Sequence, residues 1–199
     1  MYPLVESLRI KDGIIVNLPY HNQRLNRSKA ELYPGSPEIE LATLISVPGN
    51  CLQGTFKVRV LYDQLVREIE ISPYQFRPIN SLKIVHHESI DYHIKYTNRQ
   101  ILQELFARRG DCDDIIIVKN GMVSDSYTAN LLFFDGDNWF TPTTPLLKGT
   151  KRQFLLDQGT ISEKEIREED IRNFRKVGLI NAMIDFEEMP EVPVERVFE

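Results

Sequence analysis

The sequence predicts an α/β protein of the α+β kind, whose first half is mostly antiparallel sheet. Two stretches in that half, 4–10 and 56–61, place apolar residues at alternate positions, and each is followed by a turn and a second extended segment. In the second half, residues 97–109 have the apolar spacing of an amphipathic helix, and shorter extended segments follow them. The 199 residues are enough for one large domain or two small ones with a buried core.

The first half is expected to form two hairpins, two helices and a further strand. Asp12-Gly13 is a strong two-residue turn signal, so residues 4–10 and 14–16 should pair as a hairpin. Pairs of proline and glycine mark the ends of both helical segments. The remaining elements are expected over residues 20–30 (helix), 38–45 (helix), 56–61 with 66–71 (hairpin) and 81–87 (strand).

The second half opens with the amphipathic helix over residues 97–109. Asn120-Gly121 is the clearest hairpin turn in the chain, and it separates the apolar run 115–118 from its partner strand. The other elements are expected over residues 131–134 with 139–141 (hairpin), 151–156 (helix), 161–167 (strand) and 177–184 (strand), with a short helix between the last two. We expect an N-terminal domain of residues 1–90 and a C-terminal domain of residues 91–199.

Composition and charge favour a cytoplasmic globular protein. The formal charge of -5 comes from 24 Lys and Arg against 29 Asp and Glu, so no basic field indicates a nucleic-acid partner. Hydrophobic residues make up 42% and charged residues 27%, which is ordinary for a soluble protein. No apolar run approaches the ~20 residues that span a bilayer, and the N-terminus lacks the apolar stretch of a secretory signal. We therefore expect no nucleic-acid partner and no membrane association.

Several common kinds of site have no matching motif in this sequence. The GxSxG, Walker and GxGxxG patterns are absent. Cys51 and Cys112 cannot build a disulfide framework and lie in no zinc-like spacing. The four histidines show no metal-ligand spacing, and His86-His87 lies on an expected strand, where neighbours face opposite sides. We therefore expect no metal site.

Three features of the sequence are weak signals of a functional site. Lys95 precedes a helix at the expected domain boundary, and a desolvated lysine becomes a nucleophile towards carbonyls. Gly149-Thr150 opens a helix, where backbone N–H groups can bind a phosphate. Arg24, with Arg27 one turn later, could bind the same phosphate. Taken singly, each has a simpler interpretation: a solvated lysine, a helix start that binds water, and a solvated basic face.

The order of five segments along the chain raises these signals. The segments are YHNQRLNRS (20–28), IKYTNRQILQEL (94–105), DDIIIVKNGMVSDSYTANLLFF (113–134), TPTTPLLKGTKRQ (141–153) and LINAM (179–183). Together they resemble the class IV aminotransferases, which are pyridoxal-phosphate (PLP) enzymes of fold type IV. The KxxNR form at 95–99 is most similar to the 4-amino-4-deoxychorismate lyases, and ESLRIKDG (6–13) resembles the family's first hairpin.

The resemblance implies a two-domain PLP fold type IV. Residues 1–90 would form the N-terminal α/β sandwich, and residues 91–199 the C-terminal PLP-binding pseudo-barrel. The fold is expected to be shortened at its N-terminus, because the sequence begins at the first hairpin, without the family's N-terminal strand and substrate-covering loop. The family also implies a homodimer, which would give exposed strands a symmetric interface.

The same resemblance assigns the groups that would anchor PLP. Lys95 would be joined covalently to the cofactor and then carry the substrate proton. Arg24 would pair with the cofactor phosphate, because a guanidinium fork matches phosphate oxygens. The helix start at Gly149 and Thr150 would bind that phosphate through backbone amides, with the Thr150 hydroxyl as a helper.

Further roles follow from the resemblance. Asp125 stands where the family usually has glutamate, and its carboxylate would keep the pyridine nitrogen of PLP protonated, so that the ring can absorb electrons. Aspartate is one methylene shorter, so the backbone must move inward or a water must bridge the contact. Asn130 would orient this loop or the phosphate. Ser7 or Glu6 falls where a lyase would give a proton to departing pyruvate.

The function implied by the resemblance is that of a 4-amino-4-deoxychorismate lyase, which forms 4-aminobenzoate and pyruvate in folate biosynthesis. The lysine would remove the proton from the carbon that bears the amine, and aromatisation of the ring would supply much of the driving force. Two alternatives stay open: an aminotransferase acting on branched-chain or D-amino acids, and an inert PLP-binding homologue. Fold alone seldom decides between such functions.

Overall fold

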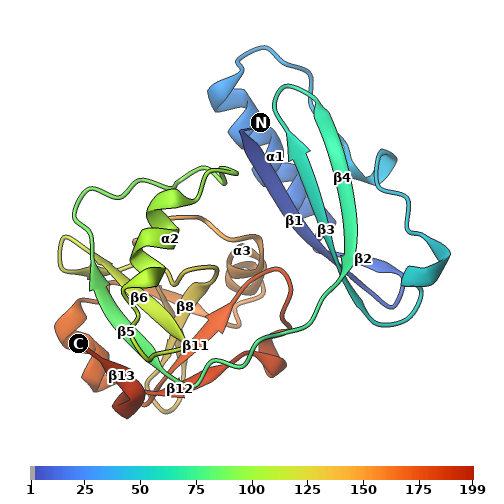
Figure 1. Ribbon diagram of the computed structural model, residues 1–199. Coiled ribbons are helices and arrows are strands. Elements are labelled where there is room, and N and C mark those ends of the chain that lie inside the picture. Colours follow the sequence, from blue (N-terminus) through green and yellow to red (C-terminus); the bar gives the residue numbers. More distant parts are fainter. Residues whose placement is uncertain (1–2) are drawn as a thin grey trace. The chain divides into compact units, whose positions relative to one another are not determined.

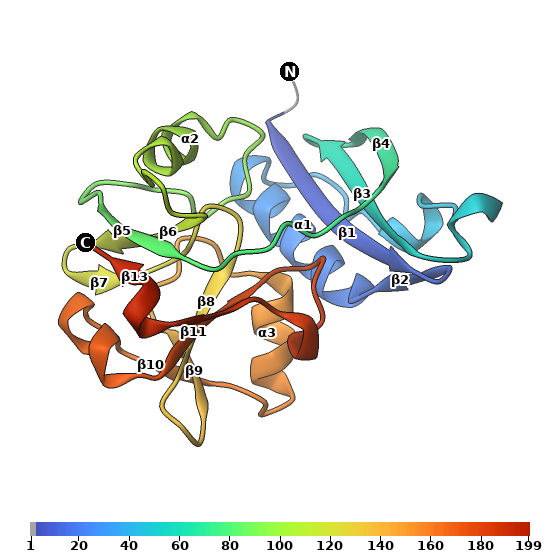
Figure 2. The same ribbon diagram turned by 60° about the horizontal axis from the view of Figure 1, so that its bottom comes forward.

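The computed structural model describes residues 3–199 and divides them into two compact units (Figures 1 and 2). Unit 1 contains the residues up to 76 together with residues 94–98. Unit 2 contains residues 77–93 and 99–199. Each unit has its own hydrophobic core.

Unit 1 is an antiparallel sheet of order β2-β1-β3-β4 with one helix on one of its faces (Figure 1). Its elements are β1 (Leu4–Lys11), β2 (Ile14–Val16), α1 (Leu18–Leu32), β3 (Thr55–Tyr62) and β4 (Val66–Pro73), with single 3₁₀ turns at Leu41–Thr43 and Gly49–Cys51. Alternate β1 residues Leu4, Leu8 and Ile10 are fully buried in the core that also contains Leu25 of α1. The strand period of two thus directs one side of β1 towards the helix.

Both hairpins expected in this unit are confirmed. The first turns at Asp12 and Gly13, whose φ angles of 48° and 82° are both positive, as a two-residue hairpin turn of this kind requires. The second joins β3 to β4, with Tyr62 paired to Val66. Strand alternation and turn chemistry therefore predict the sheet of this unit well.

The helix expected over 38–45 is wrong, because only one 3₁₀ turn forms there. Side chains of α1 bind backbone groups of this segment, among them the Ile39 carbonyl, which an α-helix over 38–45 would bond to the Thr43 amide. Asn26 donates to the carbonyl of Ile39 and accepts from its amide, each at 2.8 Å. Asn22 accepts from the amide of Leu41 at 2.9 Å. The helix expected over 20–30 is confirmed and is longer at both ends, Leu18–Leu32. It can begin before residue 20 because Pro19 fits the first turn of a helix.

Unit 2 contains two sheets that share one core. The first has the order β10-β9-β8-β11-β12 and the second the order β13-β5-β6-β7. The strands are β5 (Leu82–His86), β6 (Asp114–Lys119), β7 (Met122–Val123), β8 (Asn130–Phe134), β9 (Trp139–Pro142), β10 (Ser162–Lys164), β11 (Lys176–Ile180), β12 (Glu191–Pro193) and β13 (Val197–Phe198). The helices are α2 (Gln100–Ala107) and α3 (Thr150–Asp157), with 3₁₀ segments at Glu168–Asn173, Phe186–Glu188 and Val194–Arg196. Figure 2 shows α3 alongside the sheet that contains β8 and β11.

Several expected bounds in this half differ from the structure, and the strand expected over 161–167 covers only Ser162–Lys164. The boundary at residue 90 lies elsewhere, because β5 pairs in parallel with β6 and so joins residues 77–93 to unit 2. The helix expected over 97–109 begins only at Gln100. The strand expected over 177–184 ends at Ile180, where its pairing with β8 stops.

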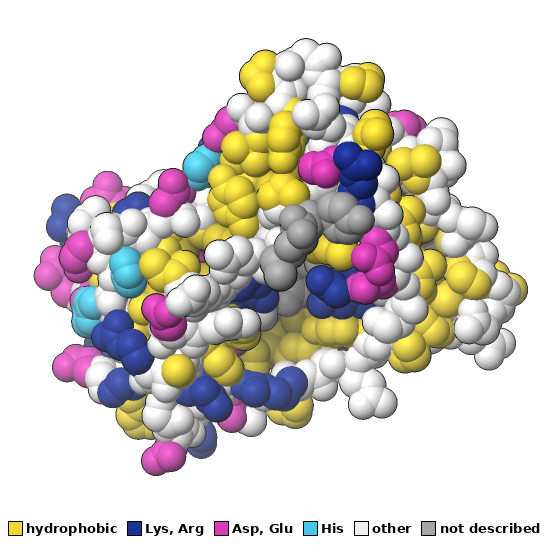
Figure 3. Space-filling model, turned by 45° about the horizontal axis from the view of Figure 1, so that its top comes forward, with side chains coloured by type: hydrophobic (Ala, Val, Ile, Leu, Met, Phe, Trp, Pro, Cys, Tyr) yellow, Lys and Arg dark blue, Asp and Glu magenta, His cyan; other side chains and the backbone are white. Residues whose placement is uncertain are grey.

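Charged side chains of both signs are intermixed on the molecular face of Figure 3, where Lys and Arg lie among Asp and Glu rather than in one continuous area. This distribution agrees with the small formal charge of the chain. Within residues 3–199, no helix is both long and apolar enough to cross a bilayer.

Candidate active site

Lys95 lies on a short segment that extends the sheet of unit 1. β2 pairs only with the C-terminal part of β1, which leaves the edge of Leu4 and Val5 for another partner. The segment 94–97 takes this edge: the Val5 amide donates to the Lys95 carbonyl at 3.1 Å, and Tyr96 forms an antiparallel bridge with Leu4. The backbone of Lys95 is therefore fixed by β1, and its side chain is half-buried.

Glu6, which follows Val5 on β1, binds the side chain of Arg24. The guanidinium donates from Nε to Oε1 at 2.8 Å and from Nη2 to Oε2 at 2.6 Å, which is a bidentate contact. His21 Nδ1 lies 2.7 Å from the same Oε2. Glu6 and His21 are fully buried and Arg24 is 6% exposed. Spacing by three residues on α1 explains why both partners face the strand.

The charges in this cluster follow from its contacts. Burial on its own raises the pKa of the Glu6 carboxyl, but the charge of Arg24 and the hydrogen bonds from His21 and Arg24 hold that pKa well below its usual range. Burial lowers the pKa of His21, and the charges of Arg24 and Lys95 lower it further against the opposing effect of Glu6. Glu6 is therefore ionised, and the neutral His21 donates to it from Nδ1. Arg24 and His21 thus engage both oxygens of Glu6, and the expectation that Ser7 or Glu6 gives the proton to departing pyruvate stays a prediction.

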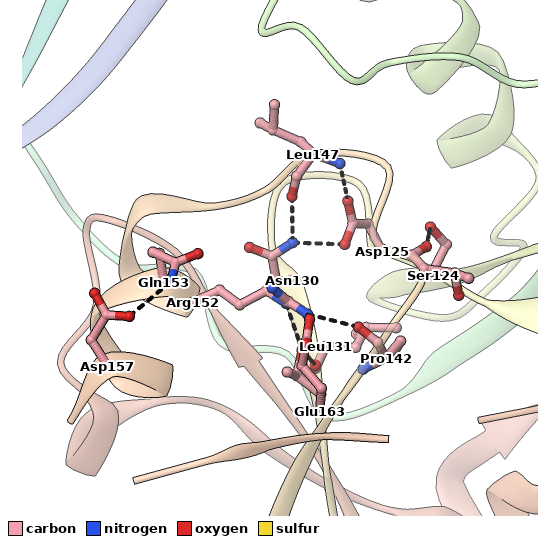
Figure 4. A network of polar contacts seen from close by, with 12 residues as sticks. Ser124, Asp125, Asn130, Leu131, Pro142, Leu147, Arg152, Gln153, Asp157 and Glu163 are labelled. Atoms are coloured by element: carbon pink, nitrogen blue, oxygen red, sulfur yellow. Dashed lines mark hydrogen bonds and ion pairs between the residues drawn. The ribbon is translucent and has the colours of Figure 1, made fainter. Parts of the chain in front are cut away.

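In unit 2, a tight turn brings Asp125 and Asn130 side by side (Figure 4). The turn is closed by the hydrogen bond from the Ser126 amide to the Ala129 carbonyl, at 2.9 Å. Asn130 Nδ2 donates at 2.8 Å both to Asp125 Oδ1 and to the Leu147 carbonyl. The Leu147 amide donates to Asp125 Oδ2 at 2.9 Å. The two side chains thus fix the backbone that leads into α3.

Gly149 is the N-cap residue that directly precedes α3, and it has no room for a side chain. A Cβ there would lie 1.9 Å from Asn130 Oδ1, well inside van der Waals contact. Its φ of -69° is open to any residue, so the requirement for glycine is one of space rather than backbone conformation. Thr150 and Lys151 follow in the first turn of α3 and are buried. Their amides belong to the first turn of α3, where backbone N–H groups are oriented to bind an anion.

Burial raises the pKa of Asp125 to about 6, and the hydrogen bonds from Leu147 and Asn130 only partly offset this. Because this pKa lies above the unfolded value of 3.8, the folded state holds the proton more tightly. The stability that Asp125 contributes is therefore complete below pH ~4 and is lost as the pH rises through about 6. A shift of about two pKa units corresponds to ~3 kcal/mol of unfolding free energy.

We expect this loss to appear when wild type and Asp125→Asn are unfolded by urea, free of cofactor, at several pH values. The unfolding free energy of the wild type minus that of the variant should fall by up to ~3 kcal/mol between pH ~4 and ~7. Glu6 changes stability in the opposite direction below its unfolded pKa, but it is present in both proteins and cancels. The exposed Asp111→Asn is the control for the same substitution outside the site. A constant difference for Asp125→Asn would contradict the pKa.

The expected site residues fall into two sets, one in each unit. Within unit 1 the structure brings Lys95 and Arg24 to the same end of β1. Within unit 2 it brings together Asp125, Asn130 and the start of α3 at Gly149 and Thr150. Sequence reasoning missed Glu6 and His21 as partners of Arg24. The signal was a carboxylate between Leu4 and Leu8 on the apolar side of a strand, where a charged residue requires a buried partner.

The comparison with protein families gives a match over almost the whole chain. Residues 3–192 fit the model of amino-transferase class IV. The chain belongs to this family. Class IV aminotransferases and aminodeoxychorismate lyases are PLP-dependent enzymes, so the resemblance drawn from the five sequence segments is confirmed.

Two relatives show how this class IV chain relates to proteins of other organisms. An uncharacterised protein of Haemophilus influenzae is 40% identical over 185 residues, which are 92% of this chain and 98% of that one. A protein of Schizosaccharomyces pombe with the name "Putative aminodeoxychorismate lyase" is 27% identical over 194 residues, covering 86% of this chain and 82% of that one.

Solved structures of the class IV fold agree with the fold described above. The crystal structure of a "putative 4-amino-4-deoxychorismate lyase" from Haemophilus somnus has a TM-score of 0.88 and 34% identity, covering 92% of this chain and 97% of that one. A PLP-bound "hypothetical aminotransferase" from Mycobacterium tuberculosis has a TM-score of 0.78 and 19% identity, covering 100% of this chain and 81% of that one. The second likeness concerns the fold alone.

The chemistry of the two sets fits PLP, judged for each unit separately. Unit 1 supplies a lysine amine for the aldehyde and an arginine for the phosphate. Unit 2 supplies a helix start kept open by Gly149 and a buried carboxylate at Asp125. Each Asp125 oxygen accepts one hydrogen bond and retains a second lone pair, so it can also accept from a pyridinium N–H.

Proposed function

We propose that this class IV enzyme is a 4-amino-4-deoxychorismate lyase of folate biosynthesis that uses PLP. The observation that carries the proposal is the likeness to the Haemophilus somnus structure, which extends over nearly the full length of both chains. The Schizosaccharomyces pombe relative supports the same activity through its name. The KxxNR segment that begins at Lys95 agrees with this choice.

In this proposal the cofactor is held at its two ends. Lys95 is the residue that would hold the aldehyde end of PLP, through Nζ. Arg24 and the backbone amides of Thr150 and Lys151 bind the phosphate, because a fixed guanidinium and a helix start both favour an anion. Asn130 keeps the loop before α3 in place, through its bond to the Leu147 carbonyl.

The protein's part in the reaction is to position the substrate and to move one proton. Once the substrate amine has replaced it on the cofactor, the free amine of Lys95 would take that proton from the ring carbon that bears the substrate amine. Bound PLP supplies the electron sink, and the Asp125 carboxylate holds the proton on its pyridine nitrogen. Loss of pyruvate then leaves the aromatic ring of 4-aminobenzoate. Because Arg24 and His21 engage both oxygens of Glu6, Ser7 is the other residue expected to supply the proton for pyruvate.

An assay with one substrate separates lyase from aminotransferase. With aminodeoxychorismate and no added keto acid, the enzyme should release 4-aminobenzoate and pyruvate in equal amounts, measured by chromatography and by coupling to lactate dehydrogenase. An aminotransferase would instead convert a D- or branched-chain amino acid in the presence of 2-oxoglutarate. Turnover of that pair, with no pyruvate from aminodeoxychorismate, would overturn the proposal.

The proposal includes a cytoplasmic homodimer, as the family resemblance implies. Mass measurement by light scattering during size-exclusion chromatography should give twice the chain mass of 23.2 kDa. A monomer at assay concentrations would remove the dimer from the proposal without affecting the lyase assignment.

A further inference from the structure

Glu6 is a fully buried charged residue of unit 1 to which the proposed chemistry gives no role. It lies on β1 between two fully buried leucines. Its contacts with Arg24 and His21 satisfy both carboxylate oxygens. A carboxylate in such a place costs several kcal/mol of desolvation unless it is paired and hydrogen-bonded. Burying this pair is weak evidence for a stabilising role, so another reason for the carboxylate must be sought.

The geometry of the pair restricts how Arg24 can present its charge. Glu6 accepts from Nε and Nη2, so one edge of the planar guanidinium is fixed against β1. An arginine on a helix otherwise has several rotamers, and ordering such a side chain when a ligand binds weakens the binding. The hydrogen bond from His21 to Oε2 fixes the carboxylate in turn. The three side chains therefore form a preorganised unit before any anion arrives.

We propose that Glu6 is a positioning residue for the cofactor phosphate, which acts by holding the Arg24 guanidinium in its anion-binding orientation. This inference rests on the proposed function, because it takes PLP as the ligand of Arg24. His21 supports Glu6 from the other side. The effect of Glu6 should depend on the phosphate of the ligand, because the rest of PLP has no contact with Arg24 in the proposal.

The test compares two aldehydes, PLP and pyridoxal, which lacks the phosphate. For each protein, apparent dissociation constants are measured from the fraction trapped on Lys95 by borohydride. In Glu6→Gln one amide N–H would face the donors of Arg24 or His21, so the guanidinium must turn away. The ratio of the pyridoxal constant to the PLP constant should fall about tenfold, and pyridoxal binding should change little. A ratio equal to or above that of the wild type would overturn the inference.

Two further variants keep the test decisive. Glu6→Asp retains the buried charge but cannot reach both guanidinium nitrogens, so it should fold where Glu6→Gln does not and show the same fall in the ratio. In an Arg24→Gln background, Glu6→Gln should cause no further fall, since Glu6 acts through Arg24. An independent second fall would contradict the positioning role. Glu70→Gln, which breaks the half-exposed pair with Arg59 in the same sheet, is the matched control and should leave the ratio unchanged.

Failure of the inference differs from failure of the proposed function. If wild-type protein traps neither aldehyde on Lys95, the proposed function fails. If it traps both and the Glu6 variants keep the wild-type ratio, only the role of Glu6 fails.

Discussion

Lys95→Ala is expected to abolish covalent attachment of PLP and to lower the rate of 4-aminobenzoate formation by ~10³-fold or more. The variant removes both the amine that holds the cofactor and the group that moves the proton, and a positioned general base alone contributes ~10²–10⁴-fold. The fold should be retained, because β1 binds the backbone carbonyl of Lys95 rather than its side chain. Absorbance of the bound cofactor, steady-state rates and circular dichroism measure the three outcomes.

Two variants show whether this loss is specific. Lys95→Arg keeps the positive charge but cannot form the covalent link, so it should be as inactive as Lys95→Ala. Lys57→Ala removes another half-buried lysine of unit 1, on β3, and should retain wild-type activity. Activity of Lys95→Ala above a tenth of the wild type would show that another group performs the chemistry.

Gly149→Ala should weaken PLP binding strongly and lower the unfolding free energy by ~2–4 kcal/mol. The new Cβ would lie 1.9 Å from Asn130 Oδ1, so Asn130 must move and release its hydrogen bonds to Asp125 and Leu147. Overpacking costs ~1–3 kcal/mol and each lost hydrogen bond adds ~1 kcal/mol. The start of α3 would shift with the loop. Urea denaturation and titration with PLP measure the two effects.

A second glycine provides the control for this substitution. Gly49 also begins a short helical turn, has no positive φ, and would place a Cβ with no heavy atom within 4 Å. Gly49→Ala should therefore leave both stability and PLP binding close to the wild type. In an Asn130→Ala background, Gly149→Ala should cost much less than it does alone, because the clashing oxygen is gone. Additive losses would show that the space argument is wrong.

The sequence predicts those parts of the fold that depend on local signals. Asp12-Gly13 and Asn120-Gly121 require positive φ angles, and both turns form as expected. The segment 38–45 has helical composition but forms only one 3₁₀ turn, because Asn22 and Asn26 of α1 bind its backbone. Pairing of β5 with β6 across more than twenty residues is a tertiary choice as well. Local propensity does not register such long-range partners.

The sequence predicts which residues belong to the candidate site, but not which of them contact one another. Lys95, Arg24 and Asp125 follow from the family resemblance of their segments. The contact that requires Gly149 joins two residues that are far apart along the chain, and only the folded turn at Asn130 reveals it. For Glu6 the sequence indicates that a buried partner must exist, because the residue lies on the apolar side of β1. Its distance along the chain from Arg24 does not indicate that Arg24 is this partner.

Mass spectrometry of the borohydride-reduced enzyme shows directly whether PLP is attached to Lys95. Trypsin normally cleaves after Lys83, Lys95 and Arg99, and it will not cleave at a lysine whose amine is substituted. We expect a single modified peptide that spans residues 84–99 and carries the mass of the reduced cofactor on Lys95. The same mass on a different lysine, or cofactor that borohydride leaves unattached to the chain, would contradict it.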